Sequence, residues 1–186
     1  MPRRQVPHAA PGVDPQSALA AWLRQVADFP RPDIVFQDIT PLLADRDAFR
    51  AAVNGLAEPF GHSDVDLVVA VESRGFMLGG AVAHQLNAGF IPVRKAGKLP
   101  AETLSLPYAL EYGEAVLEIH ADAVARGQHV LIVDDLLATG GTAAATIQLV
   151  EQLGGVIVGI AFLVELADLR GSAALGTHRH ISLITI

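Results

Sequence analysis

The chain has 186 residues, of which 51% are hydrophobic and 18% are charged, a composition that excludes a disordered protein and supports a core of ordinary size. The formal net charge of −7 argues against general binding of nucleic acid or of an anionic membrane surface. The absence of cysteine excludes disulfides, thiolate catalysis and cysteine-ligated metals, and it suits a reducing cytoplasm.

The first part of the chain predicts an arm followed by two helices. Residues 1–13 are rich in proline and lack the apolar core of a secretion signal, so we expect a flexible arm before one domain over 14–186. Asp14 and Pro15 are typical of a helix start. The segment 29–43 mixes prolines with apolar residues, which predicts extended or looped chain. The first helix is marked by Leu19, Trp22, Leu23 and Val26, and the second by Phe49, Ala52, Val53 and Leu56.

Buried strands then alternate with helices. Residues 65–72 form a nearly continuous apolar run rich in β-branched residues, which predicts a strand buried on both faces. The later run over 156–164 is about half as long as a membrane span, so we expect no membrane segment. The alternation predicts an α/β fold with a mostly parallel sheet flanked by helices. The other predicted elements are helices over 74–87 and 142–153, strands over 89–95, 129–133 and 156–164, and an edge strand over 180–186.

A long segment without helical periodicity follows the predicted strand over 89–95. "AGKLPAETLSLPYALEYG" (96–113) contains prolines and glycines that break a helix, and we expect a loop there. Loops of this length inside compact domains are usually functional or mobile. The next residues, "AVLEIHADAV" (115–124), have the composition of a strand.

Three polar segments follow predicted strands. Ligands of parallel sheets bind beyond the carboxyl ends of the strands. The turn at 72–74, the strand end at 94–95 and the stretch "VLIVDDLLATGGTAAA" (130–145) are therefore expected at one rim. Within that stretch, Asp134 and Asp135 directly follow the predicted strand. Their carboxylates suit either sugar hydroxyls, which donate to them, or a hydrated Mg²⁺.

The residues after the two aspartates are suited to phosphate. Gly140 and Gly141 permit positive backbone dihedrals and the close approach of a ligand. Thr142 is predicted to begin a helix, whose free N–H groups and positive dipole end favour an anion. Thr139 adds a second hydroxyl. Phosphate beside hydroxyls and a cation indicates a phosphorylated sugar.

The string "VDDLLATGGT" resembles the phosphoribosyl pyrophosphate signature of the type I phosphoribosyltransferases. More narrowly, residues 29–169 resemble the adenine phosphoribosyltransferases, through "FPRPDIVFQDITPLL", "ESRGF", "VRKAGKLP", "LEYG" and "LVELADLRG" in that order. The resemblance implies the type I fold: a central, mostly parallel sheet flanked by helices, a small N-terminal hood (about 14–43) and a flexible catalytic loop that acts as a lid (about 96–113).

The resemblance also implies the activity. Adenine and 5-phosphoribosyl 1-pyrophosphate would give AMP and pyrophosphate in a Mg²⁺-dependent reaction of purine salvage. It implies a homodimer. With the net charge and the absence of cysteine, we expect a cytoplasmic protein that binds neither nucleic acid nor membranes.

Site residues are carried over from the motifs that match. The ribose and its phosphate would be held by Asp134, Asp135, Ala138, Thr139, Gly140, Gly141 and Thr142. The pyrophosphate would be held by Arg74, Lys95 and Lys98, because a departing polyanion needs fixed cations where its charge develops. In the family the peptide before the serine of "ESRGF", here Glu72–Ser73, is often cis.

The base would be bound by a different set. Phe36 would stack on adenine, Leu166 would lie on the other face, and backbone groups of Val35 would meet the Watson–Crick edge. Gln37 departs from the family pattern, in which a basic residue is often found at that position. Asp38 and Thr40 are expected to fix the loop rather than to touch the base.

The lid would carry the proton acceptor. Adenine must lose a ring proton as its nitrogen attacks the anomeric carbon, and the resemblance assigns that proton to Glu111. Tyr112 would help to close the lid.

Rival interpretations are a phosphoribosyltransferase for another purine and a non-catalytic sensor of purine or phosphoribosyl pyrophosphate. Known sensors of that kind carry a DNA-binding domain, for which the arm before Asp14 is too short. His178 and His180 have the spacing of strand neighbours that could bind a metal, but no third ligand is evident. Asp168 and Arg170 are interpreted as an ordinary helix surface.

Overall fold

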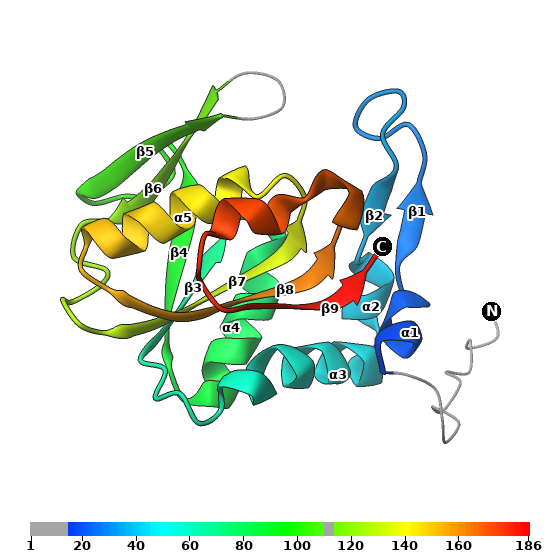
Figure 1. Ribbon diagram of the computed structural model, residues 1–186, viewed down its shortest axis with the longest axis horizontal. Helices are drawn as coiled ribbons and strands as arrows, with labels where there is room; N and C mark the ends of the chain where they lie inside the picture. Colours follow the sequence, from blue (N-terminus) through cyan, green and yellow to red (C-terminus); the bar gives the residue numbers. More distant parts are fainter. Residues whose placement is uncertain (1–14, 110–113) are drawn as a thin grey trace. The chain divides into compact units, whose positions relative to one another are not determined.

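The computed structural model describes residues 15–109 and 114–186 and is shown in Figure 1. The expected arm over 1–13 lies outside the described residues, and so do Glu111 and Tyr112. The chain divides into two compact units, one that ends at Ala52 and one over Val53–Ile186. Each unit is described by itself.

The first unit contains two short helices and a two-stranded antiparallel ribbon. Its elements are α1 (Pro15–Ala20), β1 (Arg24–Val26), β2 (Phe36–Asp38), α2 (Thr40–Ala44) and the beginning of α3 (Arg46–Ala57). The first helix was predicted to continue to Val26, but it ends at Ala20 because Arg24–Val26 pairs with β2. The expected extended chain over 29–43 contains β2 and also the short helix α2. The predicted second helix is α3.

Asp38 fixes the junction between β2 and α2, as expected. Its Oδ1 accepts hydrogen bonds from Thr40 Oγ1 at 2.6 Å and from the Thr40 N–H at 2.9 Å. Its Oδ2 forms an ion pair with Arg24 of β1. The bonds from Thr40, with a smaller contribution from Arg24, lower the pKa of Asp38 to about 2. The carboxylate therefore closes the turn and joins the two strands of the ribbon.

The second unit is built on a seven-stranded sheet in the order β5-β6-β4-β3-β7-β8-β9. Neighbours from β4 to β9 are parallel, whereas β6 and β5 are antiparallel additions at one edge. The predicted mostly parallel sheet is confirmed, with residues 180–185 as the other edge strand. The strands are β3 (Leu67–Val71), β4 (Gly89–Lys95), β5 (Thr103–Ala109), β6 (Glu114–His120), β7 (His129–Leu137), β8 (Val156–Glu165) and β9 (His180–Thr185). The helices are the end of α3, α4 (Arg74–Leu86), α5 (Gly141–Gln152), η1 (Glu58–Phe60), η2 (Ala167–Leu169) and η3 (Gly171–Leu175).

Two predictions about strands are corrected. The expected loop over 96–113 contains strand β5, which pairs with β6 over its whole length. Pro107 lies within β5 at the edge of the sheet, where the missing N–H does not interrupt a central ladder. Strand β7 was expected to end at residue 133 but continues to Leu137, so Asp134 and Asp135 are strand residues.

The two longest helices of the second unit cover opposite faces of the sheet. Val69 and Ile132 pack in one core cluster with Ile147 and Leu149 of α5. Ala70, which alternates with Val69 along β3, lies instead against α4, next to Gly79. Figure 1 shows α5 and α4 on either side of the strands. This explains why the strand at 65–72 reads as continuously apolar. In the ranges that the structure describes, no helix is long and apolar enough to cross a membrane.

Two adjacent glycines of α4 test this packing. A Cβ on Gly79 would lie 2.6 Å from the Cβ of Ala70, whereas a Cβ on Gly80 would meet nothing within 4 Å. Gly79→Ala should therefore lower the free energy of unfolding by about 1–3 kcal/mol through overpacking. Gly80→Ala should raise it by about 0.5–1 kcal/mol, because alanine favours the helix.

Urea unfolding of the two variants and of the parent chain measures both changes. Since the substitutions are chemically identical and one residue apart, a general effect of alanine would move both in the same direction. Equal stabilisation by the two would contradict the close approach of α4 to β3.

Candidate active site

The polar residues expected at one rim are brought there by three neighbouring parallel strands. The sheet order places β3 between β4 and β7, with Val71 paired to Val93 and Ala70 paired to Val133. The residues that follow these positions therefore emerge at the same edge of the sheet. This confirms the expected grouping of the 72–74 turn, the end of β4 and the aspartates of β7.

The first feature of this rim is an acidic pair held against one arginine. Arg74, the first residue of α4, has its Nε 2.7 Å from Oδ2 of Asp135. The Asp135 N–H donates to Oδ1 of Asp134 at 2.9 Å. Burial, and then the charge of Asp135, raise the pKa of Asp134. Burial also raises the pKa of Asp135, against the opposing charge of Arg74. Hydroxyl donors or a cation would stabilise such a pair in its ionised form.

The second feature is a hollow of about 350 Å³ beside the 72–74 turn. Glu72 is bound on both of its oxygens, to Arg94 Nε at 2.9 Å and to Lys98 Nζ at 2.6 Å. The peptide Glu72–Ser73 is cis, as the resemblance implied. Two of the three expected pyrophosphate residues, Lys95 and Lys98, line this hollow, whereas the guanidinium of Arg74 is paired with Asp135. The lining consists of Glu72, Ser73, Phe76, Arg94, Lys95 and Lys98.

The third feature is the turn that joins β7 to α5. Gly140 is the N-cap of α5 and has φ of 83°, a conformation that favours glycine. Gly141 is already helical, so the helix begins one residue earlier than predicted, and the positive dihedral belongs to Gly140 alone of the two glycines. Thr139 is exposed and Thr142 is half-buried in the first turn. The first-turn N–H groups of a helix have no acceptor within the helix, which leaves them for an anion.

The turn is supported from behind by η3, a feature that sequence reasoning missed. A Cβ on Gly140 would lie 2.4 Å from the carbonyl oxygen of Gly171, and a Cβ on Gly171 would lie 2.1 Å from that of Ala138. The backbones of the turn and of η3 are therefore in direct contact. The glycine that ends "LVELADLRG" was the available signal, because glycine often marks a close approach of two backbones.

The residues expected to bind the base lie in different units. In the first unit, Val35 is exposed, and the ring of Phe36 meets that of Phe29 edge-on at 5.1 Å between centroids. Gln37 is buried and alternates with Phe36 along β2, so its side chain lies on the opposite face of the ribbon from that ring. In the second unit, Leu166 follows β8, and its N–H donates to the carbonyl oxygen of Leu137.

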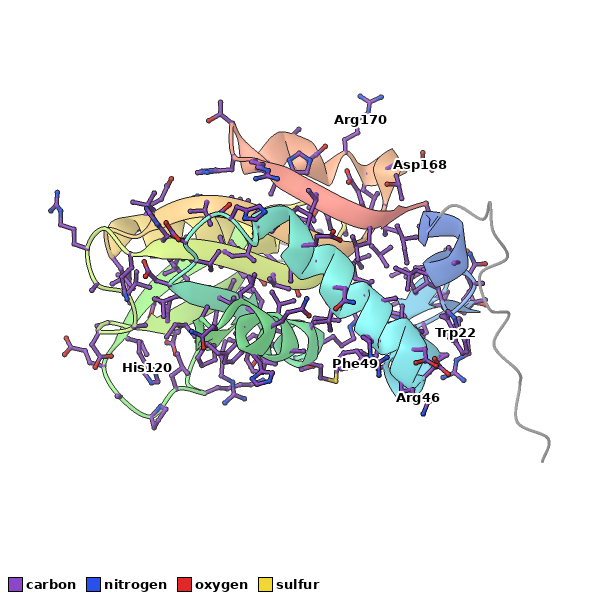
Figure 2. All side chains as sticks on the ribbon, turned by 90° about the horizontal axis from the view of Figure 1, so that it is seen from below. Trp22, Arg46, Phe49, His120, Asp168 and Arg170 are labelled. Carbon is purple, nitrogen blue, oxygen red and sulfur yellow. The ribbon has the colours of Figure 1, made fainter. Side chains whose placement is uncertain are left out.

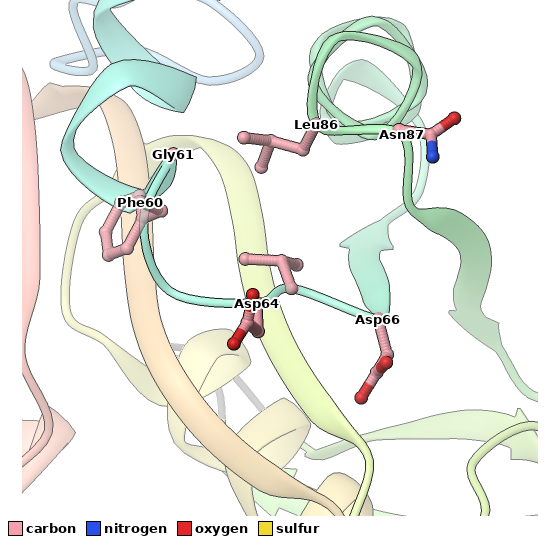
Figure 3. Close-up of a pocket in the computed structure, with 7 residues that line it drawn as sticks. Phe60, Gly61, Asp64, Asp66, Leu86 and Asn87 are labelled. Atoms are coloured by element: carbon pink, nitrogen blue, oxygen red, sulfur yellow. The ribbon is translucent and has the colours of Figure 1, made fainter.

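A second hollow, of about 320 Å³, lies at the other ends of the strands (Figure 3). Asp64 and Asp66 precede β3, and Leu86 and Asn87 precede β4. The carboxylate of Asp66 has a structural role, since its Oδ2 accepts a hydrogen bond from the His129 N–H at 2.7 Å. The acidic lining is unsuited to phosphate, so the candidate site stays at the carboxyl rim.

The remaining polar residues singled out in the sequence do not join the site. Figure 2 shows the side chains of Asp168 and Arg170 pointing outward from the η2 region. Asp168 belongs to a short 3₁₀ helix, not to an α-helix surface. His178 precedes β9 and has its Nε2 3.4 Å from Oε1 of Glu151. Within the described ranges, no three His, Asp or Glu side chains gather as a metal centre.

Comparison with known proteins agrees with this geometry. A family profile described as "Phosphoribosyl transferase domain" matches residues 43–174. An adenine phosphoribosyltransferase of Cereibacter sphaeroides is 57% identical over 150 residues, which cover 81% of this chain and 84% of that protein.

Solved structures lead to the same family. The adenine phosphoribosyltransferase of Thermoanaerobacter pseudethanolicus superposes with a TM-score of 0.89 at 50% identity, over 92% of this chain and 99% of that one. The Saccharomyces cerevisiae enzyme, complexed with an imino-altritol 1,6-bisphosphate and adenine, gives a TM-score of 0.85 at 39% identity, over 91% and 98% of the two chains. The chain therefore belongs to the adenine phosphoribosyltransferases, within the family of phosphoribosyltransferases.

Proposed function

We propose that the protein transfers the phosphoribosyl group of phosphoribosyl pyrophosphate to adenine, releasing pyrophosphate and forming AMP. One observation carries the proposal: an acidic pair with a buried Asp135, a helix N-terminus behind a glycine turn and a cationic hollow occupy the same rim of the sheet. These three features match the hydroxyls, the 5-phosphate and the pyrophosphate of one substrate. The complex of the yeast relative with adenine and a bisphosphate supports the same pair of ligands.

The reaction assigns a task to each feature. A ring nitrogen of adenine forms a bond to the anomeric carbon, the bond from that carbon to the pyrophosphate oxygen breaks, and the electron pair leaves with pyrophosphate. Lys95 and Lys98 would stabilise the charge that develops on the leaving group. The turn from Ala138 to Thr142 would hold the 5-phosphate. Arg74 would bind pyrophosphate after release from Asp135, or keep that carboxylate oriented.

The acidic pair also fits a magnesium ion. Carboxylate oxygens are the donors that Mg²⁺ prefers, and the ion usually keeps several of its waters. Asp134 and Asp135 would hold it through those waters or through the ribose hydroxyls between them. When bound, the ion would neutralise phosphate charge. A counter-charge at this position also suits two buried carboxyl groups whose pKa values are raised by burial.

On the base side, Phe36 would stack on adenine, and Leu166 is the residue of the second unit that we assign to the base. Backbone groups of Val35 would read the exocyclic amine, and this reading would penalise an oxo group. Gln37, on the opposite face of β2, would not touch the stacked base. Glu111 would accept the ring proton, and Tyr112 would close the lid. A cytoplasmic homodimer is the form that we expect from the resemblance.

The activity is tested with three bases. We expect rapid pyrophosphate release with adenine in the presence of phosphoribosyl pyrophosphate and Mg²⁺, and release at least about 100-fold slower with hypoxanthine or guanine, because both carry an oxo group where adenine carries an amine. A coupled spectrophotometric assay measures each rate. A preference for another base would assign a different purine. Binding of adenine without turnover would identify a sensor.

Two variants should separate the two halves of the site. The double variant Asp134→Asn with Asp135→Asn should weaken the binding of phosphoribosyl pyrophosphate much more than the binding of adenine, because these carboxylates are assigned to the ribose. Phe36→Ala should do the reverse, with a loss of about 1–3 kcal/mol for adenine, the usual value of base–aromatic stacking. Calorimetric titration of both variants with each ligand gives the four affinities. Loss of both ligands in either variant would point to misfolding or to a wrong assignment.

The role of Glu111 is tested by Glu111→Gln, which keeps the shape of the side chain and removes its basicity. If Glu111 accepts the proton, turnover should fall by roughly 100- to 10,000-fold while both Michaelis constants change little. Turnover, both constants and adenine-independent pyrophosphate release are measured on one preparation. Near-normal turnover at saturation would leave Glu111 as a lid residue only.

A further inference from the structure

Glu72 is a nearly buried carboxylate beside the cationic hollow, and the roles assigned above do not use it. Its side chain is 7% exposed, and its two oxygens hold two different cations. Oε2 accepts from Arg94 Nε at 2.9 Å, and Oε1 accepts from Lys98 Nζ at 2.6 Å. Arg94 Nη1 in turn donates to the carbonyl oxygen of Lys98 at 3.0 Å. The three residues form a closed ring that joins the end of β3 to the turn after β4.

The same turn is held from its other side by β6. Gly97 has φ of 76°, and its N–H donates to Oε2 of Glu118 at 2.9 Å. The other carboxylate oxygen of Glu118 accepts from Ser105 Oγ at 3.2 Å. The Glu72 N–H donates to the carbonyl oxygen of Val93 at 3.0 Å, which fixes Glu72 itself against β4. The turn that carries Lys98 is therefore anchored to both neighbouring strands.

The negative charge of Glu72 is unfavourable for a polyanion that binds in the same hollow. Burial alone would raise the pKa of Glu72, but the hydrogen bonds from Lys98 and Arg94 lower that pKa. The group is therefore ionised at neutral pH. It lines the hollow together with three cations, one of which is Lys95. A negative charge at this point opposes the entry of a polyanion. Charge alone therefore predicts that removal of the carboxylate would strengthen anion binding.

Geometry predicts the opposite. An ammonium group has three donors, so Lys98 can keep its bond to Glu72 and still donate to a phosphate oxygen. The long side chain of a lysine loses rotamer freedom when a ligand immobilises it, and that loss weakens binding unless the chain is ordered beforehand. Glu72 supplies this order to Lys98 directly and to the Lys98 backbone through Arg94.

We propose that Glu72 is a positioning residue for the pyrophosphate group of the substrate, which fixes Lys98 and Arg94 at the hollow before the ligand arrives. The inference rests on the proposed function, which brings pyrophosphate to this hollow. It makes Glu72 favourable for binding a polyanion in spite of its negative charge.

The test is a calorimetric titration of the full chain with inorganic pyrophosphate and Mg²⁺. Glu72→Gln should lower the affinity for pyrophosphate by roughly 3- to 10-fold, which is the loss expected when a lysine must be ordered by its ligand. The affinity for adenine should not change. Arg94→Lys keeps the charge but loses the planar fork that joins Glu72 to the Lys98 carbonyl, so it should weaken pyrophosphate similarly. The double variant should lose little more than either single one, because both belong to one ring.

Glu151→Gln is the matched control for net charge. It removes one carboxylate from an exposed position of α5 outside the hollow and should leave pyrophosphate affinity unchanged. Pyrophosphate binding by Glu72→Gln that equals or exceeds that of the parent chain would overturn the proposal. If Glu72→Gln does not fold, Arg94→Lys decides, since unchanged binding by that variant overturns the proposal as well. A parent chain that binds neither pyrophosphate nor phosphoribosyl pyrophosphate would instead refute the proposed function.

Discussion

The parallel register of β3 with both β4 and β7 is the constraint on which the candidate site depends. It sets Val71 beside Val93 and Ala70 beside Val133, so three chain segments change from apolar to charged residues at the same level. Each of them continues directly into charged residues. A shift of one residue in either ladder would exchange the faces of every side chain in that strand, and it would bury charges where Val69 and Ile132 now pack with α5. The apolar core therefore fixes the position of the polar rim.

The rim concentrates charge of both signs in a small volume. Asp135 pairs with Arg74, and Glu72 binds Arg94 and Lys98, so neighbouring carboxylates are matched by neighbouring cations. Buried carboxyl groups without such partners would be costly. The arrangement suits a substrate that carries phosphate groups at both ends and hydroxyls between them. Each of these groups would meet protein groups of the complementary kind.

The sequence could predict the parts of this structure that are governed by local pattern. The run at 89–95 is strand β4 with the predicted bounds, and the glycines of "ATGG" mark the turn before α5. Two edge strands were missed, because β1 and β5 are defined by their antiparallel partners rather than by their own composition. Glu72 and Gly171 were missed for a related reason: their partners lie 22 and about 30 residues away, and only the fold reveals them.

The contact between Gly140 and Gly171 restricts the substitutions that this part of the chain can accept. Gly55 is crowded by the side chain of Leu183, so a larger residue at 55 can be matched by a smaller one at 183. At Gly140 and Gly171 the crowding atoms include backbone oxygens of the facing segments, which every amino acid carries. No substitution at a neighbouring position can remove them. A compensating pair of substitutions is therefore possible at Gly55 of helix α3 but not at Gly140 or Gly171. A larger residue at either of these glycines would also require a different backbone path for η3.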